Sequence, residues 1–370
     1  MDAAGGGRSR FRDLGLTLGS LPTGPLNAIT DVPGVRVGHY TRRDGRQPGP
    51  HGEGPFNTGV TAIVPHGEDL YERRVPAAIE VLNGSGEIFG REFVDEMGML
   101  DAPIMITGSF NVACVADAVI GETTRRHPRV GRGGGYVHPL VAECSDAQLS
   151  DLVGRPMGER ETAEAWRSAA GGPVAEGSVG AGTGFVCFQF KAGIGTASRS
   201  IHVGDAAYTI GALVAANTGV RELLRIDGVP VGRLLDAPKP SWVQQGSIIM
   251  VVATDAPLLS RQLARLARRA HLGLARTGAT AHNGSGDFSI AFSTGNRYVM
   301  GQTVHGLRDV DNAATSGLFN GTVEATEEAI VNALCAATEI VGRDGNVAPV
   351  LPLRPLADLI RRYRALEHPT

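Results

Sequence analysis

The sequence predicts a protein of the α/β class, because stretches with the period of strands alternate with stretches with the period of helices. Short runs rich in Val, Ile and Ala, such as 248–252 and 102–107, are typical of buried strands. Longer segments, such as 111–122 and 257–273, repeat apolar residues every three or four positions, as a helix with one buried face does. The chain has 370 residues, 42% of them hydrophobic, which is enough for two domains or one large multilayer domain.

In the first half of the chain, Gly and Pro separate short β-branched stretches, so most of the expected elements are strands. Residues 13–41 are expected to form strands and tight turns, and 42–56, rich in Arg, Gly and Pro, an exposed loop. Beyond them we expect strands at 58–65, 76–82, 102–107 and 137–142, and helices at 111–122 and within 146–168.

In the second half, glycine recurs at every second position between Val179 and Phe185. We interpret this stretch as the entry to a strand that continues to residue 190, with a glycine face that lets another backbone come close. The remaining expected elements are a returning strand at 198–203, strands at 208–215, 248–252 and 288–292, a helix at 257–273 capped by Asp255, and helices at 323–341 and 356–363.

Composition excludes several classes of function. The formal net charge is −3, which gives no field to attract a nucleic-acid backbone. Lys191 and Lys239 are the only lysines, and neither completes a Ser-x-x-Lys motif, so Ser-Lys chemistry has no candidate. Four cysteines without a Cys-x-x-Cys pair argue against a structural zinc site or a disulfide framework. The sequence shows no signal-peptide core and no membrane-length apolar run, so a soluble cytoplasmic protein is expected.

The bond between Gly246 and Ser247 lies where a loop containing Pro238 and Pro240 changes to an apolar strand. Gly tolerates strained backbone geometry, so the Ser hydroxyl could attack the Gly246 carbonyl and displace its amide. Hydrolysis of the resulting ester would expose an α-amine. Such an amine titrates at about 7.7 to 8.0 and would serve as the general base for its own hydroxyl. On spacing alone, an ordinary turn explains the same residues.

Several long motifs then follow one another in the order found in a known family. The sequence resembles the N-terminal-nucleophile aminopeptidases, a family that includes L-aminopeptidase/D-Ala-esterase/amidase and the β-peptidyl aminopeptidases. The matching stretches are 19–39, 57–61, 179–185, 191–196, 245–248 and 284–288.

The resemblance implies a fold and a maturation step. The expected fold is a four-layer αββα sandwich of the N-terminal-nucleophile-hydrolase type, formed by residues 1–370 as a single multilayer domain. Members of the family are made as one precursor that cuts itself before the nucleophile. In this sequence the cut would fall between Gly246 and Ser247, giving a large chain, 1–246, and a small chain, 247–370.

The resemblance also assigns roles to individual residues. Asn217 would be the oxyanion donor, Ser285 and Asp287 would orient groups or relay protons, and Glu143 would bind the free α-ammonium of the substrate. Without the resemblance, Asn217, Ser285 and Asp287 are ordinary turn residues and Glu143 begins an acidic loop. One branch of the family has a Tyr where this chain has Ser145, so a Tyr contact to the oxyanion is not expected here.

The function expected from these observations is that of a self-processing serine aminopeptidase or amidase. It would release N-terminal residues from small peptides, amides or esters that carry a free amine. We expect no metal or organic cofactor, no nucleic-acid or membrane partner, and a homotetramer. Two alternatives remain: an uncut, non-catalytic binding protein on the same scaffold, and an acyltransferase related to ornithine acetyltransferase, which uses Thr as its nucleophile.

Overall fold

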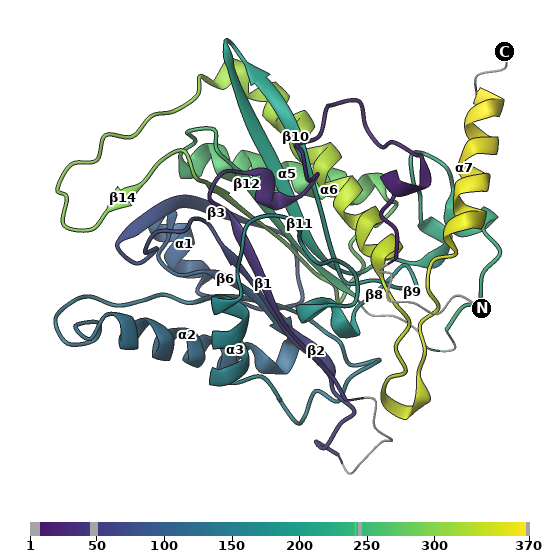
Figure 1. The fold of residues 1–370 in the computed structure, drawn as a ribbon, viewed down its shortest axis with the longest axis horizontal. Coiled ribbons are helices and arrows are strands. Elements are labelled where there is room, and N and C mark those ends of the chain that lie inside the picture. Colours follow the sequence, from purple (N-terminus) through teal and green to yellow (C-terminus); the bar gives the residue numbers. More distant parts are fainter. Residues whose placement is uncertain (1–7, 45–50, 241, 243–245, 368–370) are drawn as a thin grey trace.

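The computed structural model describes residues 8–44, 51–240, 242 and 246–367. Residues 45–50 of the expected loop and Gln245 of the Gln-Gly-Ser motif lie outside this part of the chain. Two sheets stack face to face and helices cover both outer faces, as Figure 1 shows. The predicted four-layer αββα arrangement is therefore confirmed.

The smaller sheet has five strands in the order β1-β2-β6-β7-β4. Only β6 and β7 run parallel, and β4 pairs antiparallel with β7 at one edge. Two helices, α2 and α3, cover its outer face. The elements are β1 Arg36–Arg43, β2 Asn57–Val64, β4 Ile88–Phe89, β6 Ile104–Gly108, β7 Leu140–Cys144, α2 Val112–Arg126 and α3 Glu159–Arg167.

The larger sheet has seven strands, six of them in the order β10-β11-β12-β13-β3-β14, with β5 paired to β3. Two long helices, α5 and α6, cover its outer face. The elements are β3 Arg73–Gly84, β5 Met99–Leu100, β10 Ile194–Val203, β11 Ala206–Asn217, β12 Ser247–Thr254, β13 Gly286–Ser293, β14 Tyr298–Val299, α5 Ser260–Arg276 and α6 Ser316–Ala336.

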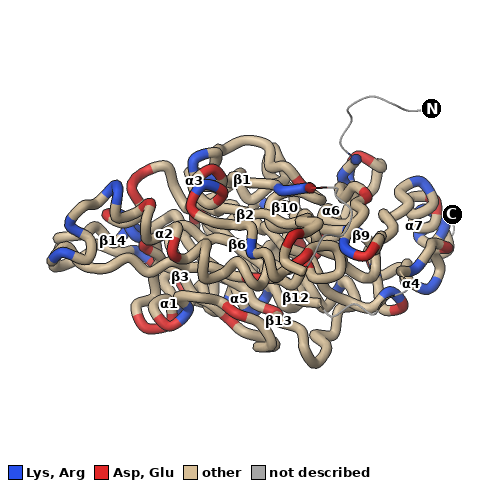
Figure 2. The backbone as a smooth tube through the Cα atoms, turned by 90° about the horizontal axis from the view of Figure 1, so that it is seen from below, with Lys and Arg blue, Asp and Glu red and all other residues tan. Residues whose placement is uncertain are grey.

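The remaining elements lie around the sandwich. The short helix α1, Arg91–Met97, follows β4, and a small hairpin pairs β8, Val186–Cys187, with β9, Phe190–Lys191. Helices α4, Val231–Leu234, and α7, Leu353–Glu367, lie at one end of the molecule (Figure 2), where α7 contacts the N-terminal turn Arg12–Leu14.

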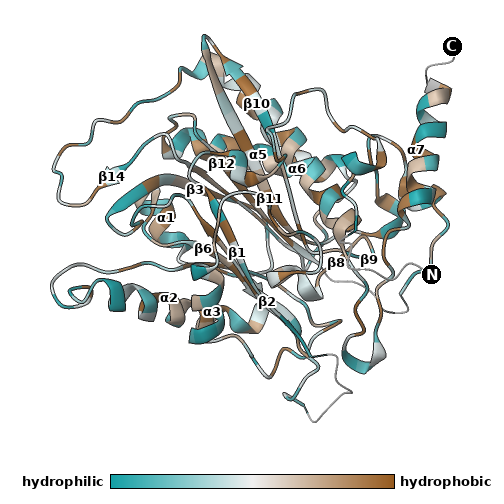
Figure 3. Ribbon diagram, in the orientation of Figure 1, coloured by the Kyte–Doolittle hydropathy of each residue, from teal (hydrophilic) through white to brown (hydrophobic). Residues whose placement is uncertain are grey.

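The core has three layers that follow from the alternation of side chains along each strand. In β12, Ile249 and Val251 face the space between the sheets, whereas Ile248 and Met250 face α5 and α6. Such strands are apolar on both faces and read as continuous apolar runs, which is why they were predictable. Figure 3 shows this distribution, with hydrophobic colour along β11 and hydrophilic turns on α2 and α7.

Several predicted elements are wrong or shorter than expected. The stretch 179–190 is not one continuous strand: Gly180–Gly184 is a 3₁₀ turn, and the chain reverses between β8 and β9 at Phe188 and Gln189, both with positive φ. The glycines do allow close approach, because a Cβ at Gly182 would lie 2.5 Å from the backbone nitrogen of Ile194. Two helices also differ from the prediction: the one within 146–168 is limited to 159–167, and the one expected at 323–341 begins and ends earlier, at 316 and 336. Asp255 accepts a hydrogen bond from Thr209 and caps no helix.

Candidate active site

Ser247 begins β12, a strand in the interior of the larger sheet. Its side chain lies on the face that Ile249 and Val251 share, toward the layer between the two sheets, and the residue is 6% exposed. The Ser247 Oγ accepts a hydrogen bond of 3.0 Å from the backbone N–H of Gly286. The hydroxyl is therefore held at the end of a rigid strand, with an amide donor directed at its oxygen.

Asn217 ends β11 directly opposite Ser247 in the antiparallel pair, so the two side chains project from the same face of the sheet. Its side-chain amide is fixed from two sides. The oxygen accepts from the N–H of Val186 at 2.9 Å, and the nitrogen donates to the carbonyl of Ser145 at 2.8 Å. One Nδ2 hydrogen is used in this way, which leaves the second as a candidate donor beside the Ser247 hydroxyl.

Ser285 and Asp287 flank Gly286 on the entry to β13. Ser285 Oγ donates to Asp287 Oδ1 at 2.7 Å, and both residues are buried. Burial raises the pKa of Asp287, and the Ser285 hydrogen bond opposes the rise only in part. Asp287 is the parallel partner of Ile248, one residue from Ser247. No hydrogen bond links Ser247 to Ser285 or Asp287 within the described residues.

Glu143 lies on β7 of the smaller sheet, and its carboxylate is held by two donors. The Ser109 hydroxyl donates to Oε2, and the backbone N–H of Glu87 donates to Oε1 at 3.1 Å. The residue is only 7% exposed. Burial raises the pKa of Glu143, with a further rise from the charge of Glu87, while the two hydrogen bonds act against it. A buried carboxylate of this kind gains from a cationic partner.

Gly86 lies between Glu143 and the group that contacts Ser247. A Cβ added at Gly86 would lie 3.0 Å from Glu143 Oε1 and 3.3 Å from the Cα of Gly286. Gly286 in turn donates to Ser247. The carboxylate and the hydroxyl, which belong to different sheets, are therefore neighbours across a stretch of backbone that carries no side chain.

The residue before Ser247 is equally crowded. A Cβ added at Gly246 would lie 2.2 Å from the carbonyl oxygen of Asn217 and 2.6 Å from the Cα of Thr218. Real Cβ atoms essentially never come so close, so any other residue at position 246 would displace the end of β11. The Gly that the sequence places at this bond is therefore a packing requirement of the site.

The groups assembled here are suited to acyl transfer. They comprise a buried hydroxyl, amide donors from backbone and side chain, a hydroxyl-carboxylate pair and a separate carboxylate. No set of three His, Cys, Asp or Glu side chains is placed to hold a metal ion in the part of the chain that the structure describes. The same part contains no helix long and apolar enough to cross a membrane.

Comparison with known proteins places this geometry in one family. The profile of peptidase family S58 matches residues 27–348. The β-peptidyl aminopeptidase of Sphingosinicella microcystinivorans is 41% identical over 376 residues, which cover 96% of this chain and 93% of that protein. This chain belongs to peptidase family S58.

Two solved structures share the fold of this S58 chain. The β-aminopeptidase of a Burkholderia species has 40% identity and a TM-score of 0.88, covering 96% of this chain and 99% of its own. The L-aminopeptidase D-Ala-esterase/amidase of Ochrobactrum anthropi, a variant of the Ntn hydrolase fold, has 38% identity and a TM-score of 0.90 at the same coverage. The predicted family, the predicted fold and the predicted enzyme class, a peptide-bond hydrolase of the aminopeptidase type, are confirmed.

Two groups in this S58 site were not predicted from the sequence. One is the backbone N–H of Gly286, because main-chain donors leave no mark in a sequence. The other is Asp146, which is fully buried and sits between Gly108 and Gly184: a Cβ at Gly108 would lie 2.6 Å from Asp146 Oδ2. Asp146 follows Ser145, whose carbonyl holds the Asn217 amide. The sequence shows an acidic stretch from Glu143 to Asp146, but the burial of Asp146 depends on packing against residues far apart in the chain.

The carboxyl group of Asp146 is almost completely shielded from solvent. Neither of its oxygens has a hydrogen bond of normal geometry, nor does the nearby Thr58 hydroxyl, within the described residues. Burial raises the pKa of Asp146 to about 7, the charge of Glu143 adds to the rise, and the proximity of Thr58 only partly opposes it. The folded state therefore binds a proton at Asp146 over a pH range in which the unfolded chain has lost it.

We expect Asp146→Asn to change how stability depends on pH. Because the folded pKa is raised, the contribution of Asp146 to stability falls as pH rises from about 4 to about 7, at up to about 1.4 kcal/mol per pH unit. The variant has no carboxyl group to titrate at this position and lacks this loss. The difference between the free energies of unfolding of variant and wild type should therefore shift in favour of the variant between pH 5 and 7 and stay constant above pH 8. Denaturant titrations at each pH measure the difference.

Asp151→Asn is the matched control. Burial acts to raise the pKa of Asp151, but N–H groups of Gly52, Val153 and Gly54 lower it overall. Its stabilisation is present above the unfolded pKa and is lost only in acid, so the deficit of Asp151→Asn should stay constant from pH 5 to 8. A pH-independent difference for Asp146→Asn as well would contradict a neutral buried Asp146.

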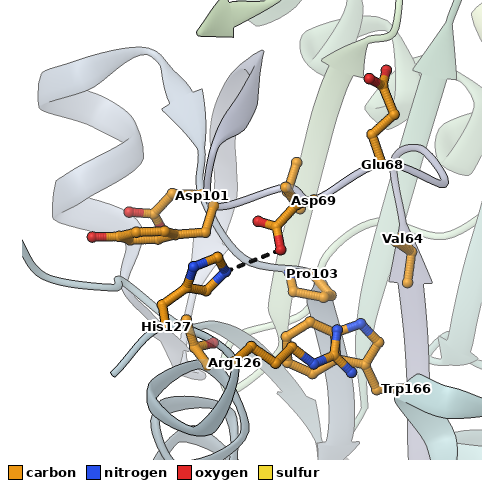
Figure 4. Close-up of a pocket in the computed structure, with 11 residues that line it drawn as sticks. Val64, Glu68, Asp69, Asp101, Pro103, Arg126, His127 and Trp166 are labelled. Atoms are coloured by element: carbon orange, nitrogen blue, oxygen red, sulfur yellow. Dashed lines mark hydrogen bonds and ion pairs between the residues drawn. The ribbon is translucent and has the colours of Figure 1, made fainter. Parts of the chain in front are cut away.

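A small cavity of about 40 Å³ lies elsewhere, at the end of α2. In Figure 4, His127 points toward Asp69, with 3.0 Å between His127 Nε2 and Asp69 Oδ2, and Arg126 lies across Trp166 at 4.5 Å from the ring centre. The charged groups of the lining already have partners: Arg126 pairs with Glu122, Asp69 with His127, Asp101 with His138 and Glu68 with Arg73. The lining contains none of the predicted site residues. This cavity is therefore not a candidate for the reaction.

Proposed function

We propose that this S58 protein is a self-processing aminopeptidase whose nucleophile is Ser247. The observation that carries the proposal is the position of the Ser247 hydroxyl, which lies at the start of β12, accepts from Gly286 and is paired across the sheet with Asn217. The curated and solved relatives carry names of aminopeptidases and amidases, which supports the same reaction class.

The first step of the proposal is cleavage of the chain. Ser247 Oγ attacks the carbonyl carbon of Gly246, the C–N bond breaks, and the α-nitrogen takes up a proton. Water then hydrolyses the ester, which leaves the Gly246 carboxylate on the 1–246 chain and a free amine on Ser247. The α-nitrogen cannot act as a base while it is an amide, so another group must accept the hydroxyl proton. The Ser285-Asp287 pair, with its raised Asp287 pKa, is suited to this task.

The second step is turnover. Ser247 Oγ attacks the carbonyl carbon of the substrate's N-terminal residue, and its proton passes to the Ser247 α-amine. That amine returns the proton to the leaving nitrogen as the acyl-enzyme ester forms. Water then attacks the ester through the same base, which releases the amino acid and restores the hydroxyl. Negative charge on the carbonyl oxygen is stabilised by Asn217 and backbone N–H groups.

Glu143 is proposed to bind the substrate's α-ammonium. Its carboxylate is buried and accepts hydrogen bonds from the Ser109 hydroxyl and the Glu87 N–H. Only the backbone of Gly86 separates it from Gly286. An ammonium is the partner that such a carboxylate lacks, whereas a further peptide unit at that position would bring no charge. The enzyme would therefore act at chain ends. The homotetramer that the resemblance implies also remains a prediction, which analytical ultracentrifugation tests.

A direct test combines denaturing electrophoresis with an assay of an amino-acid p-nitroanilide. We expect two bands on the gel, from residues 1–246 and 247–370, and release of nitroaniline in the assay. A single full-length band without hydrolysis would favour a binding protein on this scaffold. Two bands with acetyl transfer to an amino acid, and no hydrolysis, would favour an acyltransferase.

We expect Asn217→Ala to lower kcat by roughly two to three orders of magnitude, because an oxyanion donor is lost. The variant should also melt earlier, since the Val186 N–H and the Ser145 carbonyl lose their buried partner. Steady-state kinetics on a processed sample, normalised to folded protein, separate the two effects.

The control for this variant is Asn332→Ala. Asn332 is also buried and also bridges two backbone groups, accepting from Phe11 N–H at 3.1 Å and donating to the Thr196 carbonyl at 2.9 Å, but it lies on α6. Its loss should lower the melting temperature and leave kcat near the wild-type value. An Asn217→Ala enzyme that behaves in the same way would remove Asn217 from the oxyanion site.

A further inference from the structure

A groove of about 390 Å³ opens beside the edge strand β4, between α1 and the C-terminal half of α2. Its floor is apolar and partly exposed: Phe89 is 43% and Ile120 39% exposed. Phe93 stacks on His138 with ring centres 3.7 Å apart and planes 5° apart. His138 is fixed by the buried Asp101, which accepts from its backbone N–H at 3.1 Å and lies 2.9 Å from its Nδ1. The groove is therefore preformed.

The groove begins beside Glu143. Strand β4 pairs with β7 so that Phe89 lies opposite Val141, which brings Glu87 next to Glu143. The Glu87 N–H donates to Glu143 Oε1 at 3.1 Å, and the Glu87 side chain lines the groove. A group held by the Glu143 carboxylate would therefore have the groove as its immediate neighbour.

The charge on the rim is acidic. Glu87 and Glu92 both line the groove and are exposed, and within the described residues neither side chain has an ion pair. Nearby Arg91 is already paired with Asp95. Figure 2 shows acidic residues concentrated on α1, which carries Glu92. Apolar walls below two unpaired carboxylates suit an occupant with a long apolar stem and a cationic end.

We propose that this groove receives the side chain of the substrate's N-terminal residue and favours a basic one, of the lysine or arginine kind. The inference rests on the proposed function, in which Glu143 binds the α-ammonium. The amine and the side chain of an N-terminal residue branch from the same carbon, so the pocket next to the amine anchor is where the side chain lies. The stem then packs on Phe89 and Ile120, and its cation lies between Glu87 and Glu92.

The test compares lysyl and norleucyl p-nitroanilides, because norleucine has the same apolar stem without the ammonium. Wild-type enzyme should prefer the lysyl substrate in kcat/KM. The double variant Glu87→Gln/Glu92→Gln should lower the ratio of lysyl to norleucyl kcat/KM about fivefold, as two exposed ion pairs imply. The ratio is the readout because any effect of the Glu87 charge on Glu143 acts equally on both free-amine substrates. Glu96→Gln, an exposed acidic residue of α1 outside the groove lining, is the matched control and should change neither rate.

A binding measurement separates this inference from the proposed function. Lysinol and norleucinol keep the amine and the side chain but have no carbonyl to hydrolyse, so calorimetry reports their binding without turnover. Tighter binding of lysinol that is lost in the double variant supports the groove, even if no p-nitroanilide is hydrolysed, in which case only the aminopeptidase proposal fails. Equal binding of the two amino alcohols, or a lysyl preference that survives in the double variant, would overturn the groove as the side-chain site.

Discussion

Replacing Ser247 with Ala is expected to leave one uncut chain and to abolish hydrolysis of amino-acid p-nitroanilides, with a loss in kcat of at least about 10³-fold. The two losses should occur together because one hydroxyl attacks both Gly246 and the substrate. Packing should change little, since the only hydrogen bond that the Ser247 Oγ makes within the described residues is the one it accepts from Gly286. Denaturing electrophoresis and initial rates measure the two losses.

Ser293→Ala is the control for this experiment. Ser293 is a buried serine at the far end of β13, and its hydroxyl donates to the Ala256 carbonyl. This variant should be processed and should turn over substrate like wild type. If Ser247→Ala protein were still cut between Gly246 and Ser247, the autocatalytic account would be wrong.

Glu143→Gln is expected to lower kcat/KM for substrates with a free amine by one to several orders of magnitude. The charge-assisted hydrogen bond to the ammonium is lost, and leaving a buried cation without its partner typically costs a few kcal/mol. Wild type should use an amino-acid p-nitroanilide and reject its N-acetyl form, whereas the variant should lose most of this discrimination. Equal wild-type rates on both substrates would refute action at a free N-terminus.

The pH profile gives Glu143 a second test. Its pKa is raised, mainly by burial, so kcat/KM should fall as acid protonates the carboxylate, at a pH above that of an ordinary Glu. The Ser109 hydrogen bond lowers this pKa, so Ser109→Ala should move the acid limb to still higher pH. An acid limb that does not move in Ser109→Ala would place the titration on another group.

The type of many elements could be predicted from their period, whereas the four-layer arrangement was predicted from the family resemblance. Strand β12 is apolar on both faces, and helices α2 and α5 repeat apolar residues on one face, so local sequence determines their type. The prediction of a strand at 179–190 was wrong because glycine at every second position is compatible with a strand but does not require one. In the structure its backbone instead turns tightly against Ile194, a contact that no local pattern indicates.

The side chains of the candidate site could be predicted, but the contacts that bring them together from the two sheets could not. The family resemblance singled out Ser247, Asn217 and Glu143, and the structure places Asn217 directly across from Ser247. The sequence could not show that Glu143 lies beside Gly86, which in turn lies against Gly286 of the other sheet. Nor could it show that Asp146 is buried with no hydrogen bond of normal geometry within the described residues. Both depend on how two sheets stack, which joins residues far apart in the chain.

The most direct test of the central claim is N-terminal sequencing of the purified wild-type protein together with its activity. We predict a small chain that begins Ser-Ile-Ile-Met, from Ser247 onward, and that its appearance and the rise of aminopeptidase activity follow the same time course. Full activity from an uncut chain of 370 residues, or from a small chain that begins at any other residue, would contradict the claim that cleavage before Ser247 creates the nucleophile.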